Sequence, residues 1–411
     1  MKIEAPRGTH DILDKDWPHW GRILGEAKRL CDLYGYQPLT TPVFEDTGLF
    51  QRTSGVGSDV VQKEMYTFTD RGDRSLTLRP EGTAPIVRAY LEHGLHREPQ
   101  PVKLYTIAPM YRFSAPQKGR YREHWQLSVE AIGSADPATD AEVIQLYAEL
   151  LRALGIEGAT VRLNSIGDRA CRPSYVERLV RWLEEHDAEL DEEAREKRVT
   201  SPLRVFDSKD PRVQAALASA PKIGESLCPE CRAHFDDLQA FLDAYGVPYV
   251  LEPTLVRGLD YYTRTAFEFV PAARPGERRG AQSSLSGGGR YDYLAEEIGG
   301  PPTPGVGFGA GLERLHLAIE EPRRGSSPLG VFFAVEDVGK RAQVLALMAE
   351  LRRRGVRCET DYAERSLRGQ LTQANRLGAR TTVIARSGGF TLRRAGEHDR
   401  EVAAVAAEDL L

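Results

Sequence analysis

Apolar residues recur every three or four positions in two segments of the first half of the chain. From 16 to 35 these positions are Trp17, Trp20, Ile23, Leu24, Ala27, Leu30, Cys31 and Tyr34. This spacing places them on one face of a helix, with Asp16 as the cap and Gly35 as the stop. The same period returns from about 138 to 154. The pattern therefore predicts two amphipathic helices.

Shorter apolar runs predict strands between and after these helices. YQPLTTPVFE at 36–45 is expected to be extended, because its two prolines exclude a helix interior. The runs at 101–113 and 125–133 are close in sequence, so we expect them to be antiparallel neighbours. LVRGLDYYT at 255–263 is also predicted to be strand-like. Its apolar run is broken by Arg257, which indicates a polar and anionic ligand.

The middle and the end of the chain differ in composition and in the pattern of apolar residues. From about 169 to 235 the sequence is charge-rich, as in EEHDAELDEEAREKR, and no strand pattern appears until after CPEC, which predicts a helical insertion. PRRGSSPLG at 322–330 has the composition of a linker. Strand-like and helix-like runs then alternate over 331–411, as in a small α/β domain. We expect a first domain at 1–321 and a second at 331–411.

Composition sets broad limits on function. The chain has 411 residues, 41% hydrophobic and 28% charged, as in an ordinary folded soluble protein. The net charge is −5, although residues 328–411 carry 14 Lys and Arg against 11 Asp and Glu. Overall charge thus gives no sign of nucleic acid, while local basic patches still allow RNA binding. No apolar run of about 18 residues and no signal-like N-terminus occur, so we expect a cytoplasmic protein that binds neither membranes nor DNA.

The cysteines leave two interpretations open. Five cysteines, an odd number, argue against a disulfide framework. Cys228 and Cys231 form CPEC, with His234 close behind, and such a group could supply two or three zinc ligands. Because no second CxxC follows at finger-like spacing, we assign no metal and favour a reduced pair that is structural or incidental.

A glycine-rich stretch precedes an arginine near the end of the first domain. GVGFGAG at 305–311 contains a G-x-G-x-x-A match, but PPTP precedes it where a dinucleotide fold needs a strand. No P-loop occurs either. LERLHLAIE then predicts a helix with Arg314 in its first turn, which could give a phosphate a partner. The alternative is tight strand–helix packing with a solvated arginine.

A second group of polar residues lies at 108–133. Its basic loop holds Lys118, Arg120 and Arg122, with Tyr121 between them and His124 and Trp125 behind. Cations interleaved with aromatics suit phosphates and stacked bases, although a solvated hairpin tip would look the same. Arg112, Gln126 and Glu130 lie inside the strands, where a charge is costly unless it is paired or serves a ligand.

Two further stretches are weak signals in isolation. LTLRPEGTAP at 76–85 places Glu81 and Thr83 after a proline turn. SGGGRYDYL at 286–294 has consecutive glycines, which permit close approach of a ligand or another chain segment.

The order of these motifs resembles that of the histidyl-tRNA synthetases, which are class II aminoacyl-tRNA synthetases. GYQPLTTPVFEDTGLF is similar to class II motif 1, PMYR…HWQLSVEAIG to motif 2 and GVGFGAGLERL to motif 3. LVRGLDYYT and GGGRYD are similar to the two peptides peculiar to the histidine-specific branch. The resemblance runs from PRGTHDIL to the last domain and so covers nearly the whole chain.

The resemblance implies an α+β fold and a two-step reaction. It implies a six- or seven-stranded antiparallel sheet with flanking helices, a helical insertion and a C-terminal α/β anticodon-binding domain. Histidine and ATP would give histidyl-adenylate and pyrophosphate, with Mg²⁺ required by the ATP chemistry. Histidine would then pass to the terminal adenosine of the histidine tRNA. Motif 1 would build the interface of a homodimer.

Residue roles also follow from the resemblance. Arg112 and Arg257 would hold the α-phosphate and Arg314 the γ-phosphate, with His124 or Trp125 stacked on adenine. Glu81, Thr83 and Gln126 would bind the α-amino group, while Glu130 and Tyr262 contact the imidazole and Tyr261 lines the pocket. The tRNA would be bound by Gln117, Lys118, Arg120 and Arg122.

The chain departs from the family at one point in motif 2. The family pattern is Arg-x-Glu-Arg, but Arg112 is followed here by Phe113, Ser114 and Ala115. The usual glutamate contact to the adenine amino group is therefore missing. Two alternatives are a non-catalytic regulatory paralogue of histidine biosynthesis and a non-catalytic RNA-binding protein. The paralogue normally lacks the C-terminal domain and the arginine of LVRGLDYYT, both of which are present here.

Overall fold

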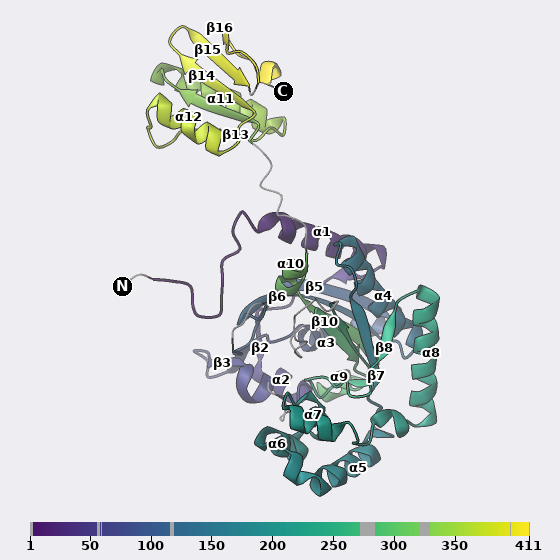
Figure 1. The fold of residues 1–411 in the computed structure, drawn as a ribbon. Coiled ribbons are helices and arrows are strands. Elements are labelled where there is room, and N and C mark those ends of the chain that lie inside the picture. Colours follow the sequence, from purple (N-terminus) through teal and green to yellow (C-terminus); the bar gives the residue numbers. More distant parts are fainter. Residues whose placement is uncertain are drawn as a thin grey trace. The chain divides into compact units, whose positions relative to one another are not determined.

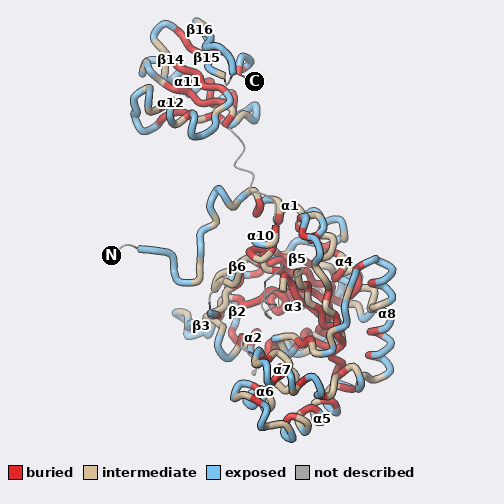
Figure 2. Tube along the Cα trace, in the orientation of Figure 1, coloured by how far each residue is buried: buried red, intermediate tan, exposed pale blue. Residues whose placement is uncertain are grey.

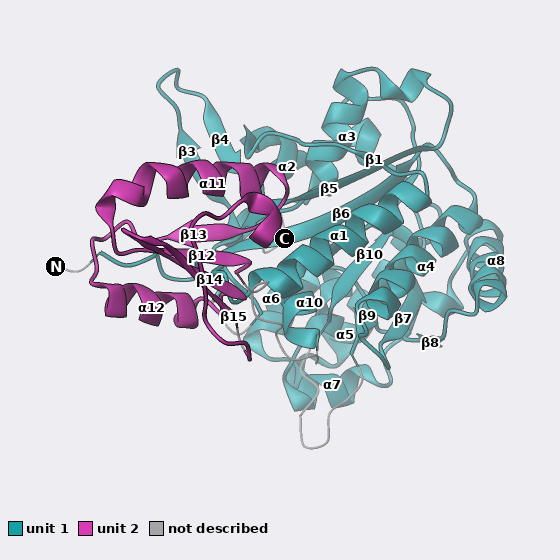
Figure 3. Cartoon of the chain, turned by 90° about the horizontal axis from the view of Figure 1, so that it is seen from above, with its two compact units in different colours: residues 1–322 teal, residues 323–411 magenta. Residues whose placement is uncertain are grey.

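The protein divides into two compact units, residues 1–322 and 323–411 (Figure 3). The computed structural model describes residues 3–55, 58, 60–115, 119–271, 284–319, 329–394 and 396–410. Gln117, Lys118 and most of the predicted linker lie outside the described residues. Among the described helices, none combines the length and apolar character needed to span a membrane.

An eight-stranded sheet is the centre of the first unit (Figure 1). In spatial order its strands are β1 (Gln37–Pro38), β5 (Val102–Tyr111), β6 (Glu123–Ile132), β11 (Gly305–Gly311), β10 (Ser286–Arg290), β9 (Thr263–Val270), β7 (Thr160–Ser165) and β8 (Tyr249–Leu251). The six strands from β5 to β7 are antiparallel to their neighbours, whereas the short β1 and β8 pair in parallel at the two edges. The expected antiparallel α+β core is confirmed, with these two edge strands added.

Helices bury both faces of this sheet, as the red strands of Figure 2 show. Apolar residues of α1 (Trp17–Leu33), α4 (Pro137–Ala153), α8 (Pro229–Tyr245) and α10 (Leu312–Ala318) share one core cluster with the strands. A second cluster joins β5, β6 and β9 to α3 (Thr83–Glu92) and α9 (Leu294–Glu297). The two helices predicted from apolar periodicity are therefore confirmed as α1 and α4.

Two smaller parts complete the first unit. A three-stranded sheet holds β2 (Phe44–Asp46), β4 (Ser75–Leu78) and β3 (Tyr66–Thr69), with α2 (Thr47–Thr53) following β2. Between β7 and α8 the described chain is helical, with α5 (Arg172–Glu185), α6 (Glu192–Thr200), a 3₁₀ helix (Pro202–Asp207) and α7 (Pro211–Leu217). This segment has its own small apolar core, which includes Leu179, Leu183 and Val213.

The prediction of a strand at 255–263 is wrong. This stretch is an irregular loop between β8 and β9, and pairing begins only at Thr263. Side chains donate hydrogen bonds to backbone carbonyls that would otherwise pair with a neighbouring strand. Asn164 Nδ2 donates to the Leu255 carbonyl at 2.9 Å, and Arg172 donates to the Tyr262 carbonyl at 2.6 Å. The loop is thus held by side chains of β7 and α5 rather than by a neighbouring strand.

The second unit is a small α/β sandwich. Its five-stranded sheet has the order β13 (Cys358–Thr360), β12 (Val331–Val335), β14 (Thr381–Arg386), β15 (Gly389–Arg394) and β16 (Arg400–Val402). α11 (Arg341–Arg353) and α12 (Leu367–Arg376) belong to separate apolar clusters that take alternate residues of β12. Because alternate residues point to opposite faces, the two helices cover opposite faces of the sheet.

Candidate active site

The motif residues meet in one cavity of the first unit, with a volume of about 690 Å³. This volume suits a nucleotide together with a small metabolite. The predicted residues that line it are Glu81, Thr83, Arg112, Arg120, His124, Gln126, Arg257, Tyr261, Tyr262 and Arg314. They come from segments far apart in the sequence. Glu130 and Arg122 do not line the cavity.

The guanidinium of Arg257 lines the cavity. Its Nε is buried and has no hydrogen-bond partner among the described residues, and its Cζ lies 5.9 Å from the centre of the Tyr262 ring. A β-carbon on Gly287 of β10 would come within 2.2 Å of Arg257 Nη2. Gly287 therefore makes room for this guanidinium. A buried cation donor without a protein partner is costly unless an anionic ligand binds it.

The two other predicted phosphate ligands are tethered by backbone carbonyls. Arg112 Nε donates to the Pro80 carbonyl at 2.7 Å. Arg314 Nε donates to the Gly119 carbonyl at 3.3 Å, and its Nη1 donates to the Ser284 carbonyl. A guanidinium carries five N–H donors, so these contacts orient each arginine while leaving donors for a ligand.

A buried carboxylate lies at the start of α3. Glu81 accepts hydrogen bonds from the backbone N–H groups of Thr83 (2.6 Å) and Ala84 (2.8 Å). The Tyr261 hydroxyl donates to it at 3.5 Å. Burial raises the pKa of Glu81, while these backbone bonds and Arg112 lower it. Glu81 is thus an oriented acceptor on the cavity wall.

Glu130 lies behind the cavity wall instead of in it. Its two carboxyl oxygens accept hydrogen bonds from the Thr83 hydroxyl (2.7 Å) and from the Tyr291 hydroxyl (2.6 Å). Burial raises the pKa of Glu130 to about 8. Each carboxyl oxygen thus accepts one neighbouring hydroxyl and has a second lone pair, and the direct contact of Glu130 with imidazole stays a prediction. The role of Tyr291, within the quoted GGGRYD, was missed from the sequence.

Glu130→Gln is expected to remove a pH-dependent loss of stability. Below an ordinary glutamate pKa of 4.5 the carboxyl is protonated in both the folded and the unfolded chain. As the pH rises toward 8, the unfolded chain releases a proton that the folded chain keeps, so the wild type loses stability. The slope is at most about 1.4 kcal/mol per pH unit.

Urea unfolding between about pH 5 and pH 9 measures this effect. The free energy of unfolding of Glu130→Gln, relative to that of wild type, should rise with pH and then level off above pH 8. The exposed Glu98→Gln serves as the control and should show no such trend. A constant difference between Glu130→Gln and wild type across the range would contradict the assignment.

Of the two aromatics behind the basic loop, His124 faces the cavity. Trp125 instead packs edge-on against Trp20, with ring centres 6.2 Å apart. Desolvation, aided by Arg112, Arg314 and Arg120, lowers the pKa of His124 to about 3, so its ring is neutral at physiological pH. Ser114 also lines the cavity, and its buried hydroxyl has no partner among the described residues.

Arg120 and Arg122 of the basic loop contact different parts of the protein. Arg120 lines the cavity and pairs with Glu64 at 3.0 Å. Arg122 turns toward the N-terminal segment: its Cζ lies 3.9 Å from the centre of the Phe113 ring, and its Nη1 donates to the Arg7 carbonyl at 3.4 Å. The two arginines that the sequence grouped together are therefore in different environments.

Several lining residues were not found from the sequence. Arg204, Phe206, Asp207 and Gln214 come from the helical insertion, where a charge-rich pattern gives no sign of a site. Glu313 also lines the cavity, and its Oε1 accepts from the Trp125 N–H at 2.9 Å. Burial raises the pKa of Glu313 to about 7. The signal in the sequence was the position of Glu313 directly before Arg314, in the stretch LERL.

Comparisons with known proteins agree over nearly the full length. A family model described as histidyl-tRNA synthetase matches residues 8–315. The histidine–tRNA ligase of Moorella thermoacetica is 47% identical over 387 residues, covering 93% of this chain and 90% of that protein. The one from Natranaerobius thermophilus is 45% identical over 388 residues, covering 93% and 91%. The crystal structure of apo S. aureus histidyl-tRNA synthetase matches with a TM-score of 0.79 and 36% identity, covering 97% of both chains. By its sequence, its fold and its motifs, the chain belongs to the histidyl-tRNA synthetase family.

Proposed function

We propose that this protein is a histidine–tRNA ligase. It activates histidine with ATP, releasing pyrophosphate, and then transfers the histidyl group to the 3′ end of the histidine tRNA. The observation that carries the proposal is the meeting of Arg112, Arg257 and Arg314 with Glu81 in one cavity. A triphosphate needs the cations, and an amino acid's ammonium needs the carboxylate.

Activation is a displacement at the α-phosphorus of ATP. The histidine carboxylate forms a bond to this phosphorus, and the bond to the β-phosphate oxygen breaks as pyrophosphate leaves. Negative charge on the α-phosphate oxygens is stabilised by Arg112 and Arg257, and Arg314 binds the γ-phosphate. The tethers on Arg112 and Arg314 fix these cations before ATP arrives.

The amino acid is bound at the Glu81 side of the cavity. Glu81 and the Gln126 carbonyl accept from the α-ammonium, and Thr83 accepts through its lone pairs because its proton is donated to Glu130. The amide nitrogen of Gln126 donates to Ser128 at 2.8 Å, which orients this side chain. Tyr261 and Tyr262 line the imidazole pocket, and Glu130 is a positioning residue acting through Thr83 and Tyr291.

Adenine would stack on His124, with the Ser114 hydroxyl as a polar partner in place of the family's glutamate. Mg²⁺ is expected to enter with ATP, where it shields charge on the phosphates. The buried Glu313 Oε2 has no hydrogen-bond partner among the described residues, and Glu64, Glu252 and Glu268 also line the cavity, so carboxylates that could hold the ion are present.

Two surfaces would bind the tRNA. Arg120 and Arg122, with Gln117 and Lys118 of the same loop, would contact the acceptor end. Residues 331–411 would bind the anticodon, which agrees with their excess of Lys and Arg over Asp and Glu.

A homodimer would be built on the β1–β2 segment. β1 is a short edge strand of the large sheet, and edges are normally covered. Val43, Phe44 and Phe68 nearby are 40%, 49% and 42% exposed, and the two phenylalanine rings meet edge-on. Apolar side chains gathered in this way mark an interaction surface.

Phe44→Glu is expected to weaken this dimer, because it places a charge in an apolar interface. Sedimentation velocity should show dimers for wild type and monomers for the variant at the same concentration. The exposed Tyr245→Glu, on α8, is the control and should remain dimeric. A wild type that sediments as an active monomer at every concentration would overturn the homodimer.

Aminoacylation tests the proposed function directly. Purified protein is incubated with ATP, Mg²⁺, labelled histidine and the histidine tRNA, with another tRNA as the control. Histidine should become acid-precipitable only with its own tRNA. Binding of this tRNA without any charging would support a non-catalytic RNA-binding protein instead.

A further inference from the structure

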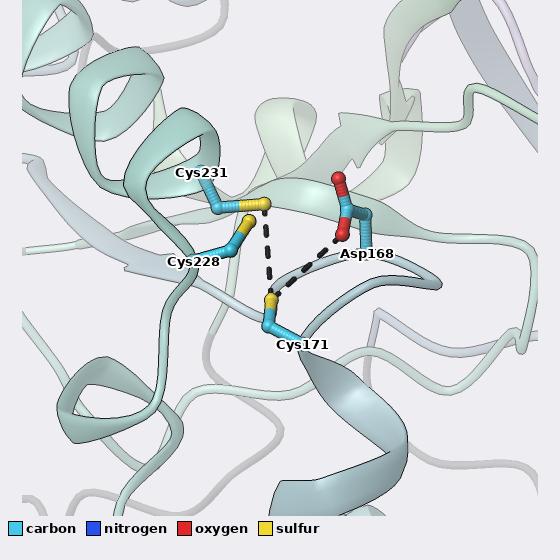
Figure 4. A group of neighbouring side chains, drawn as sticks. All are labelled: Asp168, Cys171, Cys228 and Cys231. Carbon is cyan, nitrogen blue, oxygen red and sulfur yellow. Dashed lines mark hydrogen bonds between the residues drawn. The ribbon is translucent and has the colours of Figure 1, made fainter.

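A compact group of potential metal ligands lies outside the active site. Asp168 and Cys171 come from the loop after β7, and Cys228 and Cys231 come from the start of α8 (Figure 4). One oxygen or sulfur atom from each lies within 4.8 Å of all the others. Asp168, Cys171 and Cys231 are buried, and Cys228 is half-buried. Cys171 and Cys231 are 60 positions apart in the chain, so the group joins the two ends of the helical insertion.

Two of the distances between these atoms are close to those of a tetrahedral zinc site. The Sγ atoms of Cys171 and Cys231 are 3.8 Å apart, and Cys171 Sγ lies 3.8 Å from Asp168 Oδ1. Two sulfurs bound to one zinc at about 2.3 Å with tetrahedral angles are separated by about 3.8 Å. A disulfide would instead need sulfurs about 2.05 Å apart.

The surroundings orient the carboxylate for this purpose. Asp168 Oδ2 accepts from Arg264 Nε at 3.3 Å and from Nη2 at 3.2 Å, while Oδ1 accepts from the Ala170 N–H at 2.9 Å and lies on the side of Cys171. Partners of this kind hold the ligands of protein metal sites in position. Gly167 has φ +61°, and a β-carbon there would lie 2.7 Å from Cys171 Sγ, so the loop also needs a glycine beside the cluster.

We propose that Asp168, Cys171, Cys228 and Cys231 bind one Zn²⁺ ion in a closed, structural site. Three soft thiolates and one carboxylate oxygen favour zinc, and binding releases the three thiol protons to solvent. His234, which follows CPEC in the sequence, is not part of this group, and its Nε2 lies 3.8 Å from Asp140 Oδ2. Asp168 and Cys171 could not be recognised as ligands from the sequence, because nearly the whole helical insertion separates them from CPEC.

The zinc site would stabilise the loop at 255–262, which contributes to the active-site cavity. Arg172 follows Cys171 directly, and its Nη2 donates to the carbonyls of Tyr262 (2.6 Å) and Gly167 (3.0 Å). Arg264, which holds Asp168, lies two residues beyond Tyr262. Loss of zinc would therefore loosen the backbone that carries the predicted imidazole pocket.

Elemental analysis of the full-length protein, expressed with zinc in the medium and purified under reducing conditions, tests the proposal. About one zinc per chain is expected for wild type and for Cys31→Ser, a buried cysteine far from the cluster in sequence. The double variant Cys171→Ser, Cys231→Ser should lose it. A folded wild type that contains no zinc, or contains iron instead, would overturn the proposal.

A measurement on wild type alone covers the case in which the double variant does not fold. Chelation should lower the melting temperature, and added Zn²⁺ should restore it. Co²⁺ added in place of Zn²⁺ should give the intense absorption of thiolate-to-cobalt charge transfer. A melting temperature indifferent to chelator, or a Cys228–Cys231 disulfide found by mass spectrometry in non-reduced protein, would contradict the site.

Discussion

Arg257→Ala is expected to lower the rate of histidine-dependent ATP–pyrophosphate exchange by about 10²–10³-fold, the usual cost of removing one preorganised donor from a transition state. The donor is available to a ligand here, since Arg257 Nε is buried at the cavity with no partner among the described residues. The effect should fall mainly on the maximal rate, because charge on the α-phosphate grows in the transition state. Arg257→Lys should rescue little, because an ammonium cannot reproduce the forked geometry.

Two comparisons separate catalysis from folding and from RNA binding. Arg178→Ala removes an exposed arginine of the insertion that pairs with Glu225 at 3.4 Å, and it should leave the exchange rate unchanged. Arg257→Ala should bind tRNA as tightly as wild type. An Arg257→Ala protein with a normal exchange rate would remove Arg257 from the catalytic assignment.

Gly287→Ala is expected to reduce exchange by about 10²-fold, because it displaces the guanidinium of Arg257. The new β-carbon would lie 2.2 Å from Nη2 and 2.5 Å from Cζ of Arg257, so the guanidinium must move. Moving the end of a flexible side chain costs the fold little, and the melting temperature should change by only a few degrees. The catalytic position of the guanidinium, however, is lost.

A double-mutant cycle tests this mechanism. In an Arg257→Ala background there is no guanidinium to displace. Adding Gly287→Ala should therefore cause almost no further loss of the exchange rate. Gly224→Ala, where a β-carbon meets nothing within 4 Å, is the matched control in the single-variant comparison. Fully multiplicative losses in the double variant would show that Gly287 acts independently of Arg257.

Elements with strong local signals could be predicted from the sequence. The apolar faces of α1 and α4, the neighbouring runs that form β5 and β6, and the alternating pattern of the last 80 or so residues each depend on contacts close in the chain. The loop at 255–263 could not be predicted, because its conformation is decided by hydrogen bonds from Asn164 and Arg172, about 90 residues away.

The candidate site shows the same division. Motif residues such as Arg112, Arg257 and Glu81 could be named, because a charge inside an apolar stretch is conspicuous. Contributions from the insertion, such as Asp207, could not, since one charge among many carries no signal. The position of Glu130 behind Thr83 depends on the packing of Tyr291 from β10's end, which no local pattern contains.

ATP–pyrophosphate exchange with each of the standard amino acids in turn, in the absence of tRNA, tests the central claim most directly. Exchange driven by histidine alone is predicted, since the cavity joins a phosphate-binding set of arginines to a carboxylate for one amino acid. No exchange with any amino acid, in a protein shown to be folded and to bind ATP, would contradict the account and would point to a synthetase-like protein without activity.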